Sequence, residues 1–138
     1  MKAAFFLLLF VTGAKLSSAQ SLRQGNLVGL HTIEVTLSSG HTMDEFRSFF
    51  VSRVLPEYEK QWMGLRGYLV KSVRGEYKNQ FAIVWVFESE AARDRYFTRE
   101  GKANELEIAA RENVKSVEKE LANYGTYTVH YRDDWVVQ

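Results

Sequence analysis

A continuous hydrophobic run, FAIVWVF, occupies residues 81–87, and nearly all of its residues are β-branched or aromatic. Such a composition favours a strand over a helix. Alternate side chains of a strand point to opposite faces, so Ile83 and Trp85 share one face and Val84 and Val86 share the other. Both faces of this strand are apolar, and both are therefore expected to be covered.

Other segments alternate between apolar and polar residues as half-buried strands do. In residues 28–37, His31, Ile33 and Val35 lie on one face, and Thr32 and Glu34 on the other. A short turn at residues 75–79 joins two strands as an antiparallel hairpin. The predicted strands cover residues 28–37, 68–74, 80–87 and 126–138.

A helix is predicted from Thr42 onward, because Thr42 and Glu45 have the spacing of a capping box. Aromatic and apolar residues recur every four positions, so one stripe of this helix faces a core. The stripe consists of Phe46, Phe50, Val54, Tyr58 and Trp62. Pro56 interrupts the pattern and is expected to kink the helix or divide it near Val54–Leu55, because proline lacks an N–H.

A second helical region follows the hydrophobic run. Ser89 is expected to cap a helix over residues 90–100, and a longer helix follows the break at Gly101. Gly125 is placed to end that longer helix. Its predicted inward residues are Leu106, Ala110, Val114, Val117 and Leu121.

The elements therefore follow the order strand, helix, strand, strand, helix, strand. A right-handed crossover makes the first two strands parallel with the third between them, and the fourth packs outside the first. The fold class is α+β, a ferredoxin-like βαββαβ sandwich whose helices cover one face of a four-stranded sheet. A bare second face would expose a large apolar patch. A second copy stacking its own sheet there is the simplest cover, which predicts a symmetric homodimer.

The first residues resemble a secretory signal peptide. Lys2 precedes an apolar run, and Ser17 and Ala19 suit a cleavage site, so residues 1–19 are expected to be removed and the protein to be periplasmic or secreted. The apolar run is too short to span a bilayer, and no stable membrane insertion is expected after cleavage. A short disordered lead, residues 20–27, then precedes the domain at 28–138.

Charge and cysteine content exclude several classes of function. Residues 1–19 carry two lysines and no acidic residue, so their removal leaves 16 basic and 17 acidic side chains. A nucleic-acid partner, which normally needs a basic surface, is not expected. The chain has no cysteine, which rules out disulfides, thiolate ligands and a thiol nucleophile.

With this order of elements the chain resembles the dimeric α+β barrel superfamily, especially proteins similar to the antibiotic-biosynthesis monooxygenases. Two segments carry the resemblance, VLPEYEKQWMGLRGYLV at 54–70 and FAIVWVFESEAARDRYF at 81–97. The first is a helix with a late proline and a glycine-containing approach to the second strand. The second is an apolar strand that ends in aromatic, acid and serine before the next helix. The resemblance covers roughly residues 30–131.

The resemblance implies a protomer whose sheets pair into a dimer, with a pocket between helices and sheet. Some members oxidise aromatic polyketide-like substrates with molecular oxygen and no cofactor. Others degrade haem with an Asn, a Trp and a His. Here the second helical region has Tyr96 and no histidine, and the first strand has His31 in place of an Asn, which argues against haem degradation. No cofactor is expected.

Histidines and their neighbours are the candidate polar sites. His31 is either a pocket-lining proton acceptor or a hydrogen-bonded residue at the core edge. His130 and Arg132, on the strand beside the first, can approach Glu34, either as an acid–base cluster in the dimer interface or as a cross-strand salt bridge. His31 and Glu34 point to opposite faces of a strand and cannot hold one ion, so no metal site is predicted.

Aromatic residues are the candidate pocket lining, although such stripes are more often plain core. They are Tyr58, Trp62, Trp85, Tyr96 and Phe97. The sequence thus predicts an exported homodimer that binds a small apolar or aromatic molecule. A cofactor-independent monooxygenase would use His31 as its base. A non-catalytic binding or stress-related module and a structural dimer without ligand are the alternatives.

Overall fold

One sheet holds all the strands of residues 21–131 and 133–138, the part of the chain that the structure, a computed structural model, describes. The signal peptide expected at residues 1–19 and the side chain of Arg132 lie outside these ranges. The strands are β1 (Leu27–Leu37), β2 (Leu65–Lys71), β3 (Phe81–Phe87), β4 (Gly125–His130) and β5 (Asp134–Val136). The helices are α1 (Met43–Phe49), the π-helix η1 (Phe50–Val54), α2 (Leu55–Gln61), α3 (Glu90–Arg93) and α4 (Glu105–Leu121).

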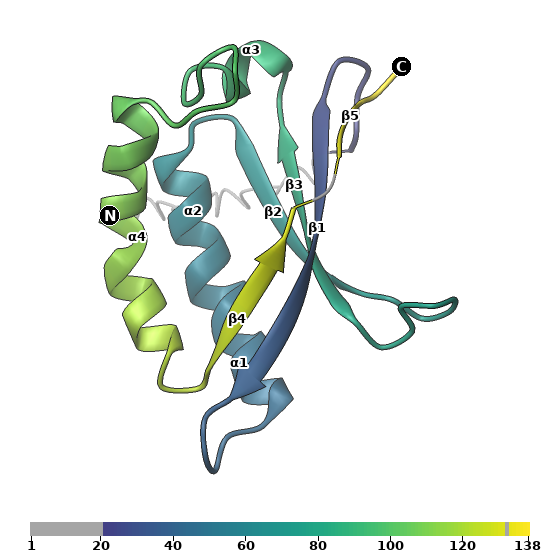
Figure 1. Ribbon diagram of the computed structural model, residues 1–138, viewed down its shortest axis with the longest axis vertical. Coiled ribbons are helices and arrows are strands. Elements are labelled where there is room, and N and C mark those ends of the chain that lie inside the picture. The colour runs from purple at the N-terminus through teal and green to yellow at the C-terminus, as the bar shows by residue number, and fades with distance from the viewer. Residues whose placement is uncertain (1–20, 132) are drawn as a thin grey trace, which may run out of the picture.

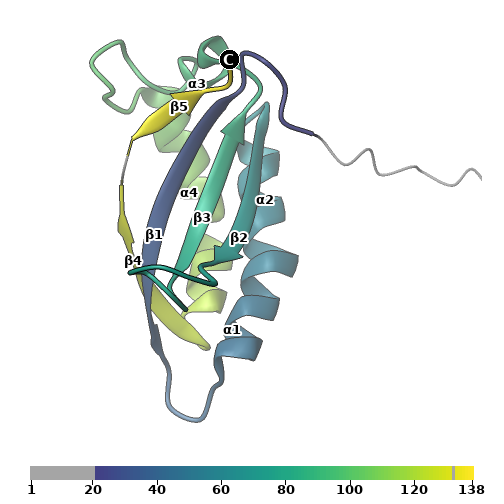
Figure 2. The same ribbon diagram turned by 90° about the vertical axis from the view of Figure 1, so that its right-hand side faces the viewer.

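The sheet has the strand order β2-β3-β1-β4, and neighbouring strands are antiparallel. β1 and β2 are therefore parallel to each other, with β3 between them. The helices lie on one side of the sheet and leave its other side open (Figures 1 and 2). This topology confirms the ferredoxin-like α+β fold predicted from the sequence.

The first helix confirms both of its predicted signals. The Thr42 backbone N–H donates to Glu45 Oε2 over 2.8 Å, and the Glu45 N–H donates to Thr42 Oγ1 over 3.3 Å, which together form the capping box. Pro56 occupies the first turn of α2, where a missing N–H is tolerated. The Leu55 N–H donates to the carbonyl of Phe50, five residues back, so a π-helical turn separates α1 from α2.

Two predicted element boundaries, the start of β2 and the end of α4, were wrong, and a glycine lies at each. β2 begins at Leu65 and passes through Gly67, which was expected to lie before the strand. A glycine is needed there because a Cβ atom would lie 2.6 Å from Trp85 Cζ3. Gly125 does not end α4, which stops at Leu121; it is the first residue of β4, where a Cβ atom would lie 2.7 Å from the carbonyl oxygen of Thr36.

The helix predicted over residues 90–100 is also wrong in length. Ser89 caps α3 as predicted, with its Oγ accepting from the Ala92 N–H over 3.1 Å, but α3 ends at Arg93. The chain then forms a small loop closed by a bridge between Phe97 and Ala103. Asn104 caps α4 by accepting from two backbone N–H groups.

The inward face of α4 differs from the prediction by one residue. Leu106 is 59% exposed, and Glu107 is 1% exposed. Positions 107, 110, 114, 117 and 121 follow alternating steps of three and four, which is the spacing of one helix face. The Glu107 carboxylate accepts a hydrogen bond from Nε of Arg111, one turn later, and so keeps a partner in the buried position.

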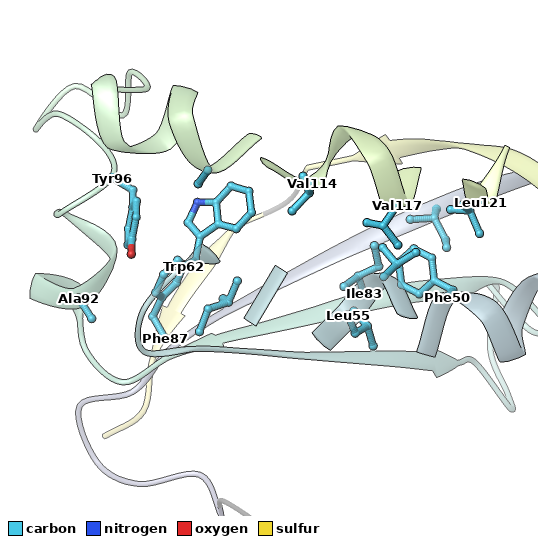
Figure 3. Packing of buried hydrophobic residues seen from close by; sticks show 14 of the residues in the cluster. Phe50, Leu55, Trp62, Ile83, Phe87, Ala92, Tyr96, Val114, Val117 and Leu121 are labelled. Carbon is cyan, nitrogen blue, oxygen red and sulfur yellow. The ribbon is translucent and has the colours of Figure 1, made fainter. Parts of the chain in front are cut away.

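The hydrophobic core lies between the helices and the sheet. Figure 3 shows Phe50, Val117 and Leu121 at one end of the cluster and Trp62, Phe87 and Tyr96 at the other. At the first end, Phe46 and Phe50 contact Tyr127 of β4 edge to face. The predicted last strand is divided, because β4 ends at His130 and β5 pairs separately with the first residues of β1.

The other face of the sheet is apolar and largely uncovered. Leu30, Val84 and Tyr68 form one row across β1, β3 and β2 on this face. Leu30 is 42% and Tyr68 44% exposed, and Trp135 of β5, on the same face, is 62% exposed. We call these four residues, together with Val70, the open face.

The segment before β1 covers one corner of the open face. Ser21 and Leu22 line a shallow groove of about 320 Å³ with Val86 and other side chains of β2 and β3. The lead expected to be disordered is hydrogen-bonded at its end, where the Gly25 N–H donates to Val137 and the Asn26 side chain donates to the carbonyl of Glu88. Val86 is accordingly buried.

Candidate functional site

A cavity of about 550 Å³ lies between the helices and the helix-facing side of the sheet. Its walls come from β1, β3, β4, α2, α4, the loop between α3 and α4, and the C-terminal segment that contains β5. α3 and β5 lie at the same end of the molecule in both views (Figures 1 and 2). The cavity therefore lies at that end, where the two layers are held apart.

Three stacked aromatic rings form one wall of the cavity. The Tyr58 ring lies between those of Trp62 and Trp85, with centroid distances of 5.0 and 5.3 Å. The interplanar angles are 14° and 23°, so the three rings are nearly parallel. Rings spaced in this way stack on one another, and together they form a continuous apolar wall.

The phenol groups behind this wall are held protonated. The Tyr58 hydroxyl donates a hydrogen bond to the carboxylate of Glu118 on α4. Burial raises the pKa of Tyr58 well above its usual range, and the nearby Tyr127 and Glu118 add to this effect. Burial raises the pKa of Tyr127 to about 12, and the charge of Glu118 contributes to that shift. Both groups are therefore neutral at physiological pH.

The floor of the cavity is bare backbone at Gly29. The sheet register places Trp85, Gly29 and Asp134 side by side on β3, β1 and β5. The Trp85 ring leans the other way, over Gly67 of β2. The space directly above Gly29 is bordered by the Asp134 carboxylate and the His31 imidazole.

His31 faces the cavity two residues beyond Gly29. Its ring is half-buried and packs edge to face with Tyr131, at a centroid distance of 4.7 Å. Burial lowers the pKa of His31 from its ordinary value of 6.5, and the charge of Asp134 raises it in part. The imidazole is therefore neutral at neutral pH. Its Nδ1 is buried and has no hydrogen-bond partner among the described residues.

A charge pair and a stacked cation border the cavity on the helical side. Glu107 is buried, and its carboxylate is bound by the Arg111 side chain. The Arg93 guanidinium lies 5.1 Å from the centroid of the Phe97 ring. The cavity thus combines an aromatic wall with a polar side.

The structure brings most of the predicted pocket residues together. His31, Tyr58, Trp62, Trp85 and Phe97 all line the cavity. Tyr96 does not. Its ring is 7% exposed, and its hydroxyl accepts from the Met63 N–H over 2.7 Å, which fixes the end of α2. The cavity is also lined by residues that were not predicted from the sequence, among them Gly29, Asp134, Tyr131, Glu107 and Arg111.

The pair predicted across β1 and β4 lies away from the cavity. His130 Nε2 is 3.2 Å from Glu34 Oε1, and both side chains are on the side of the sheet that faces away from the helices. They are substantially exposed, at 45% and 69%. The pair is a cross-strand contact on the open side of the sheet, and it is remote from His31.

In residues 21–131 and 133–138, no three His, Asp or Glu side chains are placed to hold a metal ion. No helix within these ranges is long and apolar enough to cross a membrane.

The fold and site define a ferredoxin-like α+β protein with an aromatic cavity between its layers. No family model matches the chain, and no curated protein matches it. A solved structure of SnoaB, a cofactor-independent oxygenase from Streptomyces nogalater in a substituted form, is similar to it with a TM-score of 0.46 and 15% sequence identity. The similarity covers 79% of this chain and 92% of the SnoaB chain.

Proposed function

We propose that the protein binds a small, flat aromatic molecule in the cavity between its helices and its sheet. The observation that carries the proposal is the parallel stack of Trp62, Tyr58 and Trp85 along a space of about 550 Å³. Small-molecule sites usually have volumes of about 300–1,000 Å³, with mostly apolar walls and a few polar groups. The cavity has this size and this composition.

A closed hydrophobic core would have filled this space. Protein interiors are packed nearly as densely as organic crystals. Here Trp85 and Phe97 are only partly buried, although both contact the core cluster, and Gly29 has no side chain to fill the floor. These features favour a ligand site over a structural aromatic cluster.

Blocking the cavity is expected to abolish ligand binding. Val129 of β4 lines the cavity, so the added volume in Val129→Trp would fill the ligand space. We expect at least about a tenfold loss of affinity for naphthol, measured by isothermal titration calorimetry, because the ring can no longer reach the aromatic wall. The control is Val51→Trp, since Val51 is 48% exposed. Equal naphthol affinity in Val129→Trp and in the unsubstituted protein would contradict the proposal.

Native mass spectrometry of protein from its own host would identify a retained ligand.

The proposal includes assembly and export. The open face is the surface through which two copies would pair, since it exposes Leu30, Tyr68, Val70 and Trp135 on a single sheet. Pairing two such faces removes apolar surface from water at about 25 cal/mol per Å². Export rests on the signal-peptide pattern of residues 1–19.

A second candidate function is cofactor-independent oxygenation, which His31 favours. A neutral imidazole at the cavity can accept a proton from an electron-rich hydroxylated ring. The resulting anion reacts with dioxygen: a ring C–H becomes C=O, the second oxygen atom leaves as water, and the substrate supplies all the electrons. The position of His31 beside Asp134, whose charge would stabilise the imidazolium, supports this candidate.

The second candidate predicts oxygen consumption that depends on His31. With a dihydroxynaphthalene as substrate, the rate should rise with pH through the pKa of His31 and level off, because the base acts only when unprotonated. Burial lowers that pKa, so the plateau should be reached before neutral pH. His31→Gln should abolish the enzymatic rate, and His41→Gln should retain it. Unchanged uptake in His31→Gln, measured with an oxygen electrode, would remove His31 as the base.

A further inference from the structure

The C-terminal strand supplies a carboxylate to the cavity. β5 pairs with the first residues of β1 and sets Asp134 opposite Gly29. Asp134 and Tyr131, on either side of the short segment that joins β4 to β5, both line the cavity. This segment therefore contributes to the site as well as to the sheet.

Two polar atoms lie close to the backbone of Gly29. The point where a Cβ atom at position 29 would lie is 3.0 Å from Asp134 Oδ1 and 3.1 Å from His31 Nε2. No atom of Trp85 lies as close to this point, so the aromatic wall begins beyond it. The two polar atoms therefore lie close to each other at the cavity wall, where one ligand group can approach both from the cavity side.

The chemistry of these two groups selects what can enter. An ionised carboxylate only accepts hydrogen bonds, and a neutral imidazole has one accepting nitrogen. Asp134 forms no salt bridge within residues 21–131 and 133–138, whereas the carboxylate of Glu107 is already bound by Arg111. A ligand group that donates a hydrogen bond therefore finds a carboxylate acceptor at this position. An ether or a carboxylate carries no hydrogen to donate to Asp134.

We propose that Asp134, with His31 across the bare backbone of Gly29, forms a subsite that binds a hydrogen-bond donor, a hydroxyl or amino group, carried by the aromatic ligand. The inference rests on the proposed binding of an aromatic molecule and assigns its substituent. Asp134 is then the specificity-determining residue of the cavity. Gly29 is required because a side chain would occupy the space between the two polar groups.

Matched ring compounds test the subsite. Naphthol, naphthylamine and methoxynaphthalene present the same ring with a hydroxyl donor, an amino donor or no donor. We expect the unsubstituted protein to bind the better of the two donors about tenfold more tightly than the ether, as titration calorimetry would measure, since hydrogen bonds to charged groups are stronger than neutral ones. A preference for naphthol over naphthylamine would show that His31 donates to the ligand oxygen, and the reverse would show that it accepts.

Two variants remove the subsite in different ways. Asp134→Ala deletes the carboxylate, and Gly29→Ala adds a methyl group that crowds both polar groups without deleting either. In each variant, the affinities for the donor compounds and for methoxynaphthalene should become nearly equal. In Asp134→Ala, the affinity for methoxynaphthalene itself should stay within about twofold of that of the unsubstituted protein. Asp133→Ala, at the neighbouring exposed carboxylate, is the control and should keep the preference. Thermal unfolding would show that each variant is folded.

The outcomes separate this inference from the function on which it rests. Equal binding of the ether and both donors by the unsubstituted protein would overturn the subsite and leave aromatic binding intact. A donor preference that persists in both Asp134→Ala and Gly29→Ala would overturn it as well, because the donor would then be bound elsewhere. Failure of all three compounds to bind would overturn both proposals.

Discussion

Leu30→Lys is expected to dissociate the proposed dimer into monomers. Leu30 is 42% exposed on the open face and lies in one row with Val84 and Tyr68. A buried, unpaired ammonium group is disfavoured by several kcal/mol. In a symmetric dimer the substitution occurs in both chains, so the penalty applies twice. The dissociation constant should rise by about a thousandfold or more, which light scattering at micromolar concentration would detect as a halved mass.

The monomer itself should tolerate this lysine, because the side chain lies at the surface of the single chain. Val73→Lys is the matched control, since Val73 is 79% exposed and follows the last residue of β2. It introduces the same charge outside the open face and should leave the dimer unchanged. A stable monomer of the unsubstituted protein, or a dimer that persists in Leu30→Lys, would contradict pairing through this face.

Local sequence signals determined most of the fold. The capping box at Thr42 and Glu45 involves residues three positions apart, and the effect of Pro56 acts on its own helix. The strand order follows from element order and crossover handedness. Such features need only neighbouring residues or general chain geometry, so the sequence predicted them.

The polar side of the site depends on contacts that the sequence does not encode locally. Asp134 lies opposite Gly29 only because β4 ends and the chain then pairs with β1 a second time, as β5. A single continuous strand over residues 126–138, as predicted, would have given no such register. Glu107 differs for another reason: the prediction placed Leu106 inward, although the spacing from Ala110 and Val114 places position 107 on the buried face.

Tyr96 was predicted to line the cavity, but the structure places it outside the cavity lining. Its spacing within a predicted helix suggested a cavity-facing ring. The helix ends at Arg93, and the chain turns so that the Tyr96 hydroxyl contacts the backbone at Gln61 and Met63. Because α3 ends at Arg93 and not at residue 100, this ring lies against the end of α2 and outside the cavity.

Gly67→Ala is expected to destabilise the protein and to disrupt the aromatic wall. Glycine inside a strand is normally less favourable than alanine by about 0.5–1 kcal/mol, so the backbone effect alone would stabilise β2. Here the added Cβ would lie 2.6 Å from Trp85 Cζ3 and 2.8 Å from Leu55 Cδ2. Overpacking of this kind lowers the free energy of unfolding by about 1–3 kcal/mol, which exceeds the backbone gain. Urea denaturation would measure the loss.

A second substitution shows whether Trp85 is the neighbour that opposes the added methyl group. In a Trp85→Leu background the ring is absent, so Gly67→Ala should be close to neutral or stabilising, and the two substitutions should be coupled by more than about 1 kcal/mol. Naphthol affinity separates the effect on stability from the effect on binding. The double variant Gly67→Ala, Trp85→Leu should regain stability. It should still fail to bind naphthol, because Trp85 forms part of the stacked wall. An equal loss of stability in both backgrounds would show that Leu55, rather than Trp85, opposes the extra methyl group. Full naphthol binding by the double variant would show that the wall does not hold the ligand.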